Sequence, residues 1–425
     1  MRLDREHAHA LDAGDALAAW RDRFILPRDA GSGRELVYLC GHSLGAQPVL
    51  AAEYVEDVMR DWRSLGVEGH FTGRRPWLSY HEPLAPALAT LVGAEPAEVI
   101  AMNTLTANLH LLLVSFYRPA GARRALLMER SAFPSDRHAV ESQVRFHGLD
   151  PAHDLIEIAP RDGEDLLRTA DIIATIEREG ARIATILLPG VQYLTGQLLD
   201  VEAITAAGHQ AGCVVGWDLA HAVGNVPVSL HDAGADFAVW CNYKYLNGGP
   251  GAVGGAFVHA RHATDASLPR FAGWWGHDKA TRFLMAPEFK PTPGAEGWQL
   301  SNPPILAMAP LAASLEHFAA AGLPALRQKS VALTGYFERL VQARLAGKVE
   351  IITPSLPDAR GAALSLRLVG LTRDRARGVF DGLRLRSILP DWREPDVIRA
   401  APVPFYNSFD DVWRCVDALH AELGA

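Results

Sequence analysis

Lysine is scarce in this chain of 425 residues, and its scarcity makes one lysine informative. Only five of the 41 basic residues are lysines, and none of them comes before Lys244. Arginine fills nearly every other cationic position, so a lysine between aromatic neighbours and a glycine-rich turn suggests chemistry that arginine cannot perform. A desolvated lysine can lose its proton and condense with a carbonyl, whereas a guanidinium stays charged and non-nucleophilic. The commoner interpretation is a solvated lysine at a strand end, so its neighbours must decide.

Cysteine is also scarce, and the four cysteines do not form a pattern. Cys40, Cys213, Cys241 and Cys415 lie far apart in apolar surroundings, and no C-x-x-C spacing occurs. A disulfide framework or a zinc site would require denser or regularly spaced cysteines. The sequence therefore predicts buried thiols in a reducing cytoplasm and no metal site.

Long hydrophobic runs and blocks of one charge are missing as well. No run of about 18 apolar residues occurs, and the charged N-terminal segment 1–15 predicts neither a signal peptide nor a membrane anchor. The net charge is −8 and the arginines stand singly or in pairs, which argues against a nucleic-acid partner. A hydrophobic content of 49% with 21% charged residues is typical of a soluble globular protein.

The order of apolar and polar segments predicts two units of different size. A chain of this length exceeds what one hydrophobic core usually supports. Within residues 86–305, short apolar runs alternate with helical segments, which predicts a large α/β domain with a mostly parallel sheet. Residues 306–425 begin with a long helical stretch to about residue 346 and predict a smaller α+β domain. Residues 1–85 are expected to join that smaller domain.

The N-terminal segment also contains a sequence typical of serine hydrolases. We expect a helix over residues 4–24, a strand at 35–40 and a second helix opened by Pro48. GHSLG at 41–45 lies between the last two and matches the G-x-S-x-G nucleophile elbow. A hydrolase elbow follows several strands of its sheet, yet only about 40 residues, mostly helical, precede Ser43. The favoured interpretation is a tight turn that needs its two glycines, and a serine hydrolase is a distant alternative.

Asp218 and Lys244 each end an apolar run, and they are 26 residues apart. The carboxyl ends of parallel strands meet at the edge of the sheet where ligands bind, so the two side chains can lie close together. A cofactor with a pyridine ring needs a carboxylate at its ring nitrogen and a lysine that holds its aldehyde as a Schiff base. His221, on the turn after Asp218, could orient the carboxylate or cover the ring. The alternatives are a helix N-cap for Asp218 and a structural histidine.

Two further segments have the residue types of a phosphate and ring site. Residues 102–113 read as a loop that enters a helix, with Thr104 and Thr106 at its start. Backbone N–H groups and hydroxyls at a helix N-terminus bind phosphate. Phe133 and Asp136 follow another apolar run, and Phe133 could stack on an aromatic ring. Ordinary capping and core packing remain the alternatives for these residues.

Several longer blocks are more specific than any of these patterns. They are YLCGHSLG, RPW at 75–77, FPSD at 133–136, GWDLAHAVGN, CNYKYLNGGPG, GWWGH, LSNPPIL and IRAAPVPFYNSF. In the order and spacing of these blocks, the chain resembles the kynureninase family from about residue 35 to 415. The resemblance implies fold type I of the enzymes that use pyridoxal 5′-phosphate, and hydrolysis of L-kynurenine to anthranilate and L-alanine. It also implies 3-hydroxykynurenine as a plausible second substrate, and a place in tryptophan degradation and NAD biosynthesis.

The resemblance assigns roles to individual residues. Lys244 corresponds to the Schiff-base lysine, Asp218 to the partner of the pyridine nitrogen, and Tyr243 to a phosphate-contacting tyrosine that can also move a proton. Arg399 corresponds to the arginine that holds the substrate α-carboxylate through its bidentate fork. The other implied cofactor contacts are Leu105, Thr106, Phe133, Pro134, Ser135, Asp136, His221, Trp274 and Asn302.

The resemblance also implies a homodimer with shared active sites. Trp274 and Asn302 match positions that reach a site across the dimer interface, to which residues 1–85 also contribute. We expect His70, Ser301 and Asn302 to lie around the aryl ring of the substrate, where they could accommodate a 3-hydroxyl group.

The nearest alternative is an enzyme that uses the same cofactor for a different reaction. Enzymes similar to cysteine desulfurases also have an aspartate, a histidine and a lysine in this layout, but they need a mobile cysteine late in the chain. The only late cysteine here is Cys415, in a predicted terminal helix, which is a poor place for a flexible nucleophile.

Overall fold

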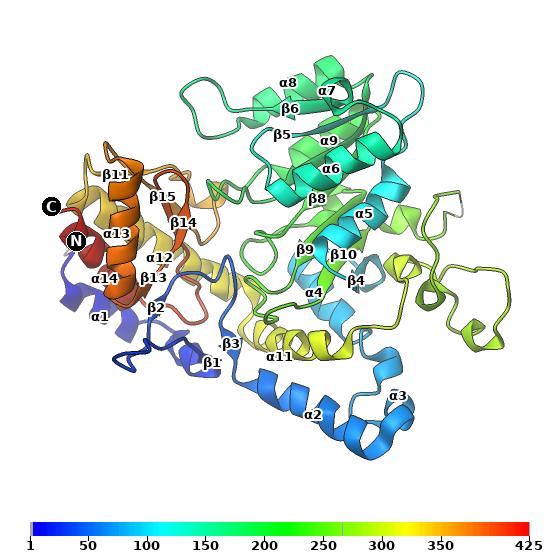
Figure 1. Ribbon diagram of the computed structural model, residues 1–425, viewed down its shortest axis with the longest axis horizontal. Helices are drawn as coiled ribbons and strands as arrows, with labels where there is room; N and C mark the ends of the chain where they lie inside the picture. The colour runs from blue at the N-terminus through cyan, green and yellow to red at the C-terminus, as the bar shows by residue number, and fades with distance from the viewer. Residues whose placement is uncertain (1–2, 266, 425) are drawn as a thin grey trace.

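The computed structural model describes residues 3–265 and 267–424, and it contains two units built on separate sheets (Figure 1). The larger sheet has seven strands in the order β4-β10-β9-β8-β7-β5-β6. The five strands from β9 to β6 are parallel, while β10 and β4 are antiparallel additions at one edge. The predicted α/β fold with a mostly parallel sheet is confirmed. The strands are β4 (Val99–Ala101), β5 (Ala125–Glu129), β6 (Leu155–Ile158), β7 (Ile183–Pro189), β8 (Val214–Asp218), β9 (Phe237–Cys241) and β10 (Gly254–Val258).

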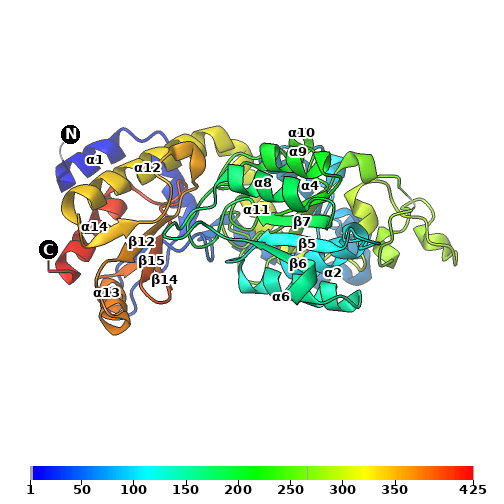
Figure 2. The same cartoon turned by 90° about the horizontal axis from the view of Figure 1, so that it is seen from above.

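Helices cover both faces of the larger sheet, which explains why its strands are apolar without alternation. Every residue of β5, β9 and β10 is buried. Figure 2 shows α8 (Thr169–Glu179) and α9 (Val201–Gln210) on one side of the sheet and α6 (Pro134–Phe146) on the other. The helix α5 (Leu105–Phe116) packs against α6 and β9. The carboxyl ends of β5, β7 and β8 therefore lie together at one edge of the sheet, between the helices on its two faces.

The smaller unit combines residues from both ends of the chain around a four-stranded sheet. The order of this sheet is β11-β12-β15-β14, and all its pairs are antiparallel. Next to it, β2 (Val37–Tyr38) pairs in parallel with β13 (Ile388–Leu389), and α1 (Arg5–Ala13) packs on α14 (Phe409–Glu422). The four strands of the sheet are β11 (Val349–Ile351), β12 (Leu364–Leu368), β14 (Asp391–Arg393) and β15 (Val397–Ala400), and α13 (Arg373–Leu385) lies beside them.

Two helix predictions need correction. The single helix expected over residues 4–24 is α1 followed by a 3₁₀ helix (Ala18–Arg23), because the chain turns at Gly14. The helix expected to open at Pro48 begins at Leu50 as α2 (Leu50–Leu65). Pro48 instead pairs with Phe24 as part of β3 (Gln47–Pro48), where a proline without an N–H is acceptable at the edge of a two-stranded ribbon.

The long helical stretch predicted after residue 305 is confirmed, and it consists of two helices. α11 (Ile305–Ala321) and α12 (Leu323–Arg344) are separated by Gly322, whose φ of 76° is a conformation that favours glycine. Within residues 3–265 and 267–424, no single helix is long and apolar enough to cross a membrane. α11 and α12 meet that test only as a pair bent by 84°.

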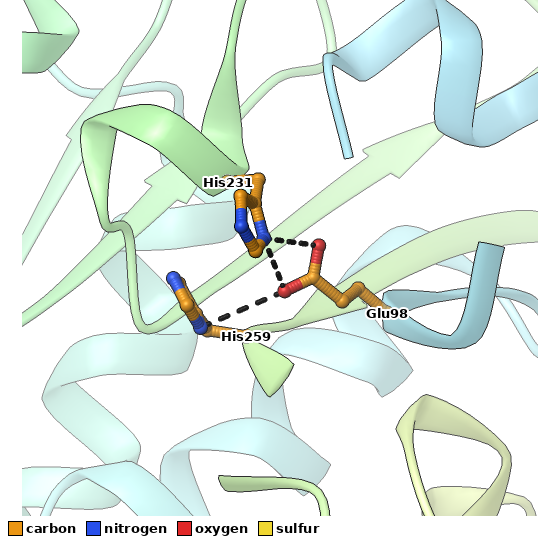
Figure 3. A group of neighbouring side chains, drawn as sticks. All are labelled: Glu98, His231 and His259. Atoms are coloured by element: carbon orange, nitrogen blue, oxygen red, sulfur yellow. Dashed lines mark hydrogen bonds and ion pairs between the residues drawn. The ribbon is translucent and has the colours of Figure 1, made fainter. Parts of the chain in front are cut away.

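A buried carboxylate, Glu98, ties the edge of the larger sheet to its surroundings (Figure 3). Its Oε1 accepts hydrogen bonds from the Ala260 N–H at 2.7 Å and from His231 Nδ1 at 2.9 Å. Its Oε2 accepts from the Glu95 N–H at 2.9 Å. His259 Nδ1 lies 3.6 Å from Oε1 and accepts the Arg261 N–H. The possible metal-ligand atoms of Glu98, His231 and His259 lie close enough together to hold a metal ion. However, both carboxylate oxygens of Glu98 already accept hydrogen bonds.

The His231–Glu98 contact predicts a pH-dependent stability. The bond to Glu98 raises the pKa of His231, so its stabilising effect is present below the ordinary histidine pKa and is lost as the pH rises through the raised value. Because His231 is partly exposed, the effect is at most about 1 kcal/mol. We expect His231→Gln to lower the melting temperature more at pH 6 than at pH 9. The exposed His153→Gln is the control, and equal losses at both pH values would contradict the prediction.

Candidate active site

A cleft opens at the carboxyl ends of β5, β7 and β8, beside the first turns of α5 and α6. This is the edge at which open parallel sheets bind ligands. Glu129, Pro189 and Asp218, the last residues of the three strands, all line it. The structure thus brings together residues that are more than 100 positions apart. The predicted site residues that line this cleft are Leu105, Thr106, Phe133, Ser135, Asp136, Asp218, His221, Tyr243 and Lys244.

The amine of Lys244 is held by a buried histidine. Its Nζ lies 3.0 Å from Nε2 of His221, and the centroids of the Phe133 and Tyr243 rings are each 5.9 Å from it. Burial, and then the neighbouring Lys244, lower the pKa of His221 well below its ordinary value. The imidazole is therefore neutral, and with its proton on Nδ1 it can accept a hydrogen bond from the amine. This contact aims the amine into the cleft without adding a second positive charge.

Three acidic side chains gather at the other end of the cleft. Asp218 Oδ1 accepts the N–H of Ala220 at 2.7 Å, which fixes the carboxylate. Burial and then the charge of Asp218 raise the pKa of Asp136, whose buried Oδ1 has no hydrogen-bond partner among the described residues. Burial raises the pKa of Glu129 to about 7, although a bond from Gln192 opposes the shift. Such a cluster favours a cationic partner, such as a protonated ring nitrogen.

The first turn of α5 forms an anion site at the side of the cleft. Thr104 precedes this helix without capping it through its side chain, so the leading N–H groups of α5 have no side-chain acceptor there. The hydroxyls of Thr106 and Ser135 lie 2.8 Å apart across the gap between α5 and α6. Unsatisfied N–H groups, two hydroxyls and the positive end of a helix dipole suit a phosphate. Pro134 opens α6 as its first residue.

Together these three regions fit pyridoxal 5′-phosphate. The amine of Lys244 suits its aldehyde, the acids suit its ring nitrogen, and the turn of α5 suits its phosphate. The unpartnered Asp136 oxygen is the clearest sign, because a buried acceptor without a donor is costly unless a ligand supplies one. Tyr243 lines the same cleft, and burial raises the pKa of its phenol, so the hydroxyl keeps its proton at neutral pH.

Arg399, the predicted carboxylate clamp, lies behind the cleft wall rather than in the open cleft. It is 1% exposed and sits on β15. Its Nε and Nη2 both donate to Asp391, and its Nη1 donates to the carbonyl of Tyr193, which lines the cleft. All three guanidinium nitrogens therefore already have partners within the protein.

Besides Pro134 and Arg399, four predicted residues lie outside this cleft in the single chain. The ring of His70 contacts Trp77 edge-on, with 5.2 Å between the ring centroids. Trp274 donates through Nε1 to the carbonyl of Arg282, and Ser301 and Asn302 are exposed just before α11. Their roles at a substrate ring or a cofactor remain predictions that require a second subunit.

The GHSLG segment is a turn that packs against the Lys244 loop. The Gly45 N–H donates to the carbonyl of Tyr243 at 2.8 Å, and a Cβ on Gly45 would lie 2.3 Å from the Lys244 carbonyl oxygen. A Cβ on Gly41 would lie 2.3 Å from the hydroxyl of Tyr406. Ser43 is exposed, and the next helix starts only at Leu50. The glycines serve close packing, and the strand–turn–helix geometry of a hydrolase elbow does not form.

Sequence reasoning missed Glu129 and Asp391. Glu129 ends the apolar run ALLME in the same way as Asp218 ends CVVGWD, so the same signal identifies it. Asp391 lies on a three-residue strand with no apolar pattern, so only its pairing with Arg399 reveals it.

Comparisons with known proteins identify the family of this chain. The model of the kynureninase C-terminal domain matches residues 326–419. The kynureninase of Stenotrophomonas maltophilia is 56% identical over 422 residues, which cover 99% of both chains. That of Xanthomonas campestris pv. campestris is 56% identical over 423 residues, covering 100% of this chain and 98% of the relative.

Solved structures agree in fold. A cysteine desulfurase from Thermococcus onnurineus superposes with a TM-score of 0.75 at 17% identity, covering 92% of this chain and 95% of that one. A cysteine desulfurase from Escherichia coli gives a TM-score of 0.75 at 17% identity, with 96% and 98% covered. At this identity, the likeness concerns the fold alone. The identity to the two bacterial kynureninases extends over nearly the whole chain, and the chain therefore belongs to the kynureninase family.

Proposed function

We propose that this protein hydrolyses the Cβ–Cγ bond of L-kynurenine to give anthranilate and L-alanine. Pyridoxal 5′-phosphate is the cofactor. The observation that carries the proposal is the arrangement of Lys244, His221 and Asp218 in one cleft, in a chain 56% identical to kynureninases along its length. We expect 3-hydroxykynurenine to be accepted as a substrate as well.

Different residues of the site are proposed to bind different parts of the cofactor. When bound, pyridoxal 5′-phosphate supplies an aldehyde that condenses with amines and a ring that stabilises negative charge at the substrate Cα. Asp218 would keep the ring nitrogen protonated, and Asp136 would contribute a second buried acid. Leu105, Thr106 and Ser135 would offer donors to the phosphate, and Phe133 would pack on the ring.

Lys244 and Tyr243 are proposed to move protons. The Nζ of Lys244 removes the proton from the substrate Cα and can return it, because neutral His221 accepts a hydrogen bond from the amine and does not compete as an acid. Water adds to the γ-carbonyl and the Cβ–Cγ bond breaks, and the Tyr243 hydroxyl, which keeps its proton at neutral pH, can then protonate Cβ of the alanine fragment. Arg399 binds the substrate α-carboxylate.

Cysteine desulfurase chemistry is disfavoured by the state of the thiols. Burial raises the pKa of all four cysteines, to about 12 for Cys40 and Cys415. Cys415 is fully buried in α14. A thiol nucleophile needs a lowered pKa and access to the substrate. The fold is shared with the desulfurases, and the reactive cysteine is not.

We also propose a cytoplasmic homodimer in which each site uses residues of the partner subunit. The segments that carry His70 and Trp274 expose large apolar side chains, including Phe71 and Leu284, which are 54% and 74% exposed. Such surfaces usually mark an interface. Four unpaired thiols support a reducing compartment. We further propose the division into residues 1–85, 86–305 and 306–425, with the first segment joining the smaller domain and the interface.

The function is tested by measuring anthranilate release from L-kynurenine by fluorescence. We expect turnover that depends on added cofactor, and a mass of two chains in solution. No anthranilate release from cofactor-loaded protein would refute the proposal.

His70 provides a test of the aryl-ring contact. If His70 donates to the 3-hydroxyl group, His70→Phe should lower kcat/KM for 3-hydroxykynurenine by about 3- to 10-fold relative to kynurenine, the effect of one hydrogen bond. Phe71→Leu, at the neighbouring exposed position, is the control. An unchanged ratio of the two kcat/KM values would assign the 3-hydroxyl contact elsewhere.

A further inference from the structure

Asp391 occupies the position on Arg399 that a substrate carboxylate would need. The two residues face each other directly in the pairing of β14 with β15. Both Nε and Nη2 of Arg399 donate to the same oxygen, Asp391 Oδ2, with Nε at 2.8 Å. Arg393 Nη2 lies 3.1 Å from that oxygen as well. One carboxylate oxygen therefore serves two guanidinium groups, and the fork of Arg399 is filled.

His42 lies beside this pair. Asp391 Oδ2 has several donors around it, whereas the buried His42 ring has no acceptor within the part of the chain that the structure describes. The His42 side chain is 1% exposed, and neither ring nitrogen has a hydrogen-bond partner among the described residues. Its Nε2 is 3.4 Å from Asp391 Oδ2, just beyond a good hydrogen bond. The ring centroid of His42 is 6.4 Å from that of His221, which contacts Lys244. A buried donor without an acceptor is costly, so this position suits a state in which Asp391 has moved closer.

We propose that Asp391 fills the carboxylate subsite of Arg399 in the substrate-free protein, and that His42 receives Asp391 when a substrate α-carboxylate takes its place. This inference rests on the proposed function, because it names how that site selects an amino acid. Asp391 and His42 are then positioning residues that act through Arg399.

The charges around Arg399 allow such an exchange. The groups that face His42 and Asp391 are Arg399, Arg393 and His221 together with the Cys40 thiol. Burial, followed by the charge of Arg399, lowers the pKa of His42 to about 4, so the imidazole is neutral. Two arginines and one aspartate leave one positive charge, which an incoming carboxylate neutralises. Arg399 exchanges one carboxylate for another and is never left buried without a partner.

The exchange also predicts selection for substrates that carry an α-carboxylate. A neutral imidazole with its proton on Nε2 can donate to the released Asp391, so no proton has to be taken up. The Tyr193 carbonyl, which accepts from Nη1, can keep the guanidinium oriented at the cleft wall throughout. An amine without an α-carboxylate has nothing with which to displace Asp391. We therefore expect the site to reject the decarboxylated analogue of kynurenine.

The test compares His42→Leu with His42→Asn in the cofactor-loaded enzyme. Leucine removes the donor while keeping a similar volume, whereas asparagine keeps an N–H. We expect His42→Leu to raise the KM of kynurenine and the calorimetric Kd of L-alanine by about tenfold, the effect of one hydrogen bond to a charged group. His42→Asn should stay within about threefold of the wild type, and in both variants the effect should fall on KM rather than on kcat.

Asp391→Asn tests the competing charge directly. Removing the carboxylate that occupies Arg399 should lower the Kd of L-alanine and leave the binding of the decarboxylated analogue unchanged. Weaker binding of L-alanine by this variant would mean that Asp391 only braces Arg399, which overturns the proposal. Equal shifts in His42→Leu and His42→Asn would overturn it too, and this pair decides alone if Asp391→Asn does not fold. If L-alanine binding follows the expected pattern while no anthranilate is released, the proposed reaction fails and the exchange stands.

Discussion

Lys244→Ala should lower kcat/KM for kynurenine by about 10³-fold or more and should change the absorbance of the bound cofactor. The substitution removes both the amine that condenses with the cofactor aldehyde and the base at the substrate Cα. The neighbouring His221 is a poor substitute, because burial lowers its pKa and so makes the imidazole a weaker base, and an imidazole cannot form a Schiff base with the aldehyde. Anthranilate fluorescence measures the first effect, and a spectrum of the purified protein near the visible edge measures the second.

Lys348→Ala is the matched control for this experiment. Lys348 donates to the carbonyls of Leu423 and Gly424 at the C-terminal end of the chain, and it does not line the cleft. It should leave both the spectrum and the turnover unchanged. A colourless Lys244→Ala protein that still releases anthranilate would refute a role for the cofactor in this cleft.

Asp218→Asn should lower kcat by about 10²- to 10³-fold while the fold is retained. The amide oxygen can still accept the N–H of Ala220, so the local turn is kept, but the charge that holds the ring nitrogen protonated is lost. Stopped measurements of anthranilate release at saturating kynurenine report kcat directly.

Glu129→Gln tests whether the charge of Asp218 in particular, rather than the acidic cluster as a whole, supports the ring nitrogen. The pKa of Glu129 is raised to about 7, so its carboxyl is mostly protonated at pH 6 and a glutamine resembles it there. We expect less than about a threefold change in kcat at pH 6. Equal losses in Asp218→Asn and Glu129→Gln at that pH would mean that the whole acidic cluster, rather than Asp218, supports the ring.

Local patterns in the sequence predict the larger sheet well. The apolar runs at β5 to β9 are recognisable because parallel strands are buried on both faces, and that pattern survives in the sequence alone. Asp218 and Lys244 are recognisable for a related reason, since polar residues at the ends of such runs meet at one edge of the sheet.

Long-range contacts account for what the sequence could not predict. Pro48 suits the first turn of a helix locally, but its pairing with Phe24 places it in a strand. The motif around Arg399 matches a carboxylate-binding arginine, yet only the register of β14 and β15 shows that Asp391 already fills it. The residues expected from a second subunit, such as Trp274 and Asn302, depend on a surface that one chain does not contain.

The pairing of β2 with β13 constrains how this chain can fold as it is made. The thiol of Cys40 and its acceptor, the carbonyl of Leu389, are 349 residues apart. Likewise, α1 is synthesised long before α14, the helix on which it packs. At about 5–20 residues per second, the N-terminal strand exists for roughly 20–70 s before its partner is synthesised. The GHSLG turn directly follows β2 and belongs to this early N-terminal segment, which is synthesised before its C-terminal partners. The turn that backs the lysine loop therefore gains its complete support last, and a nascent chain cannot assemble the finished site before its C-terminal residues have emerged.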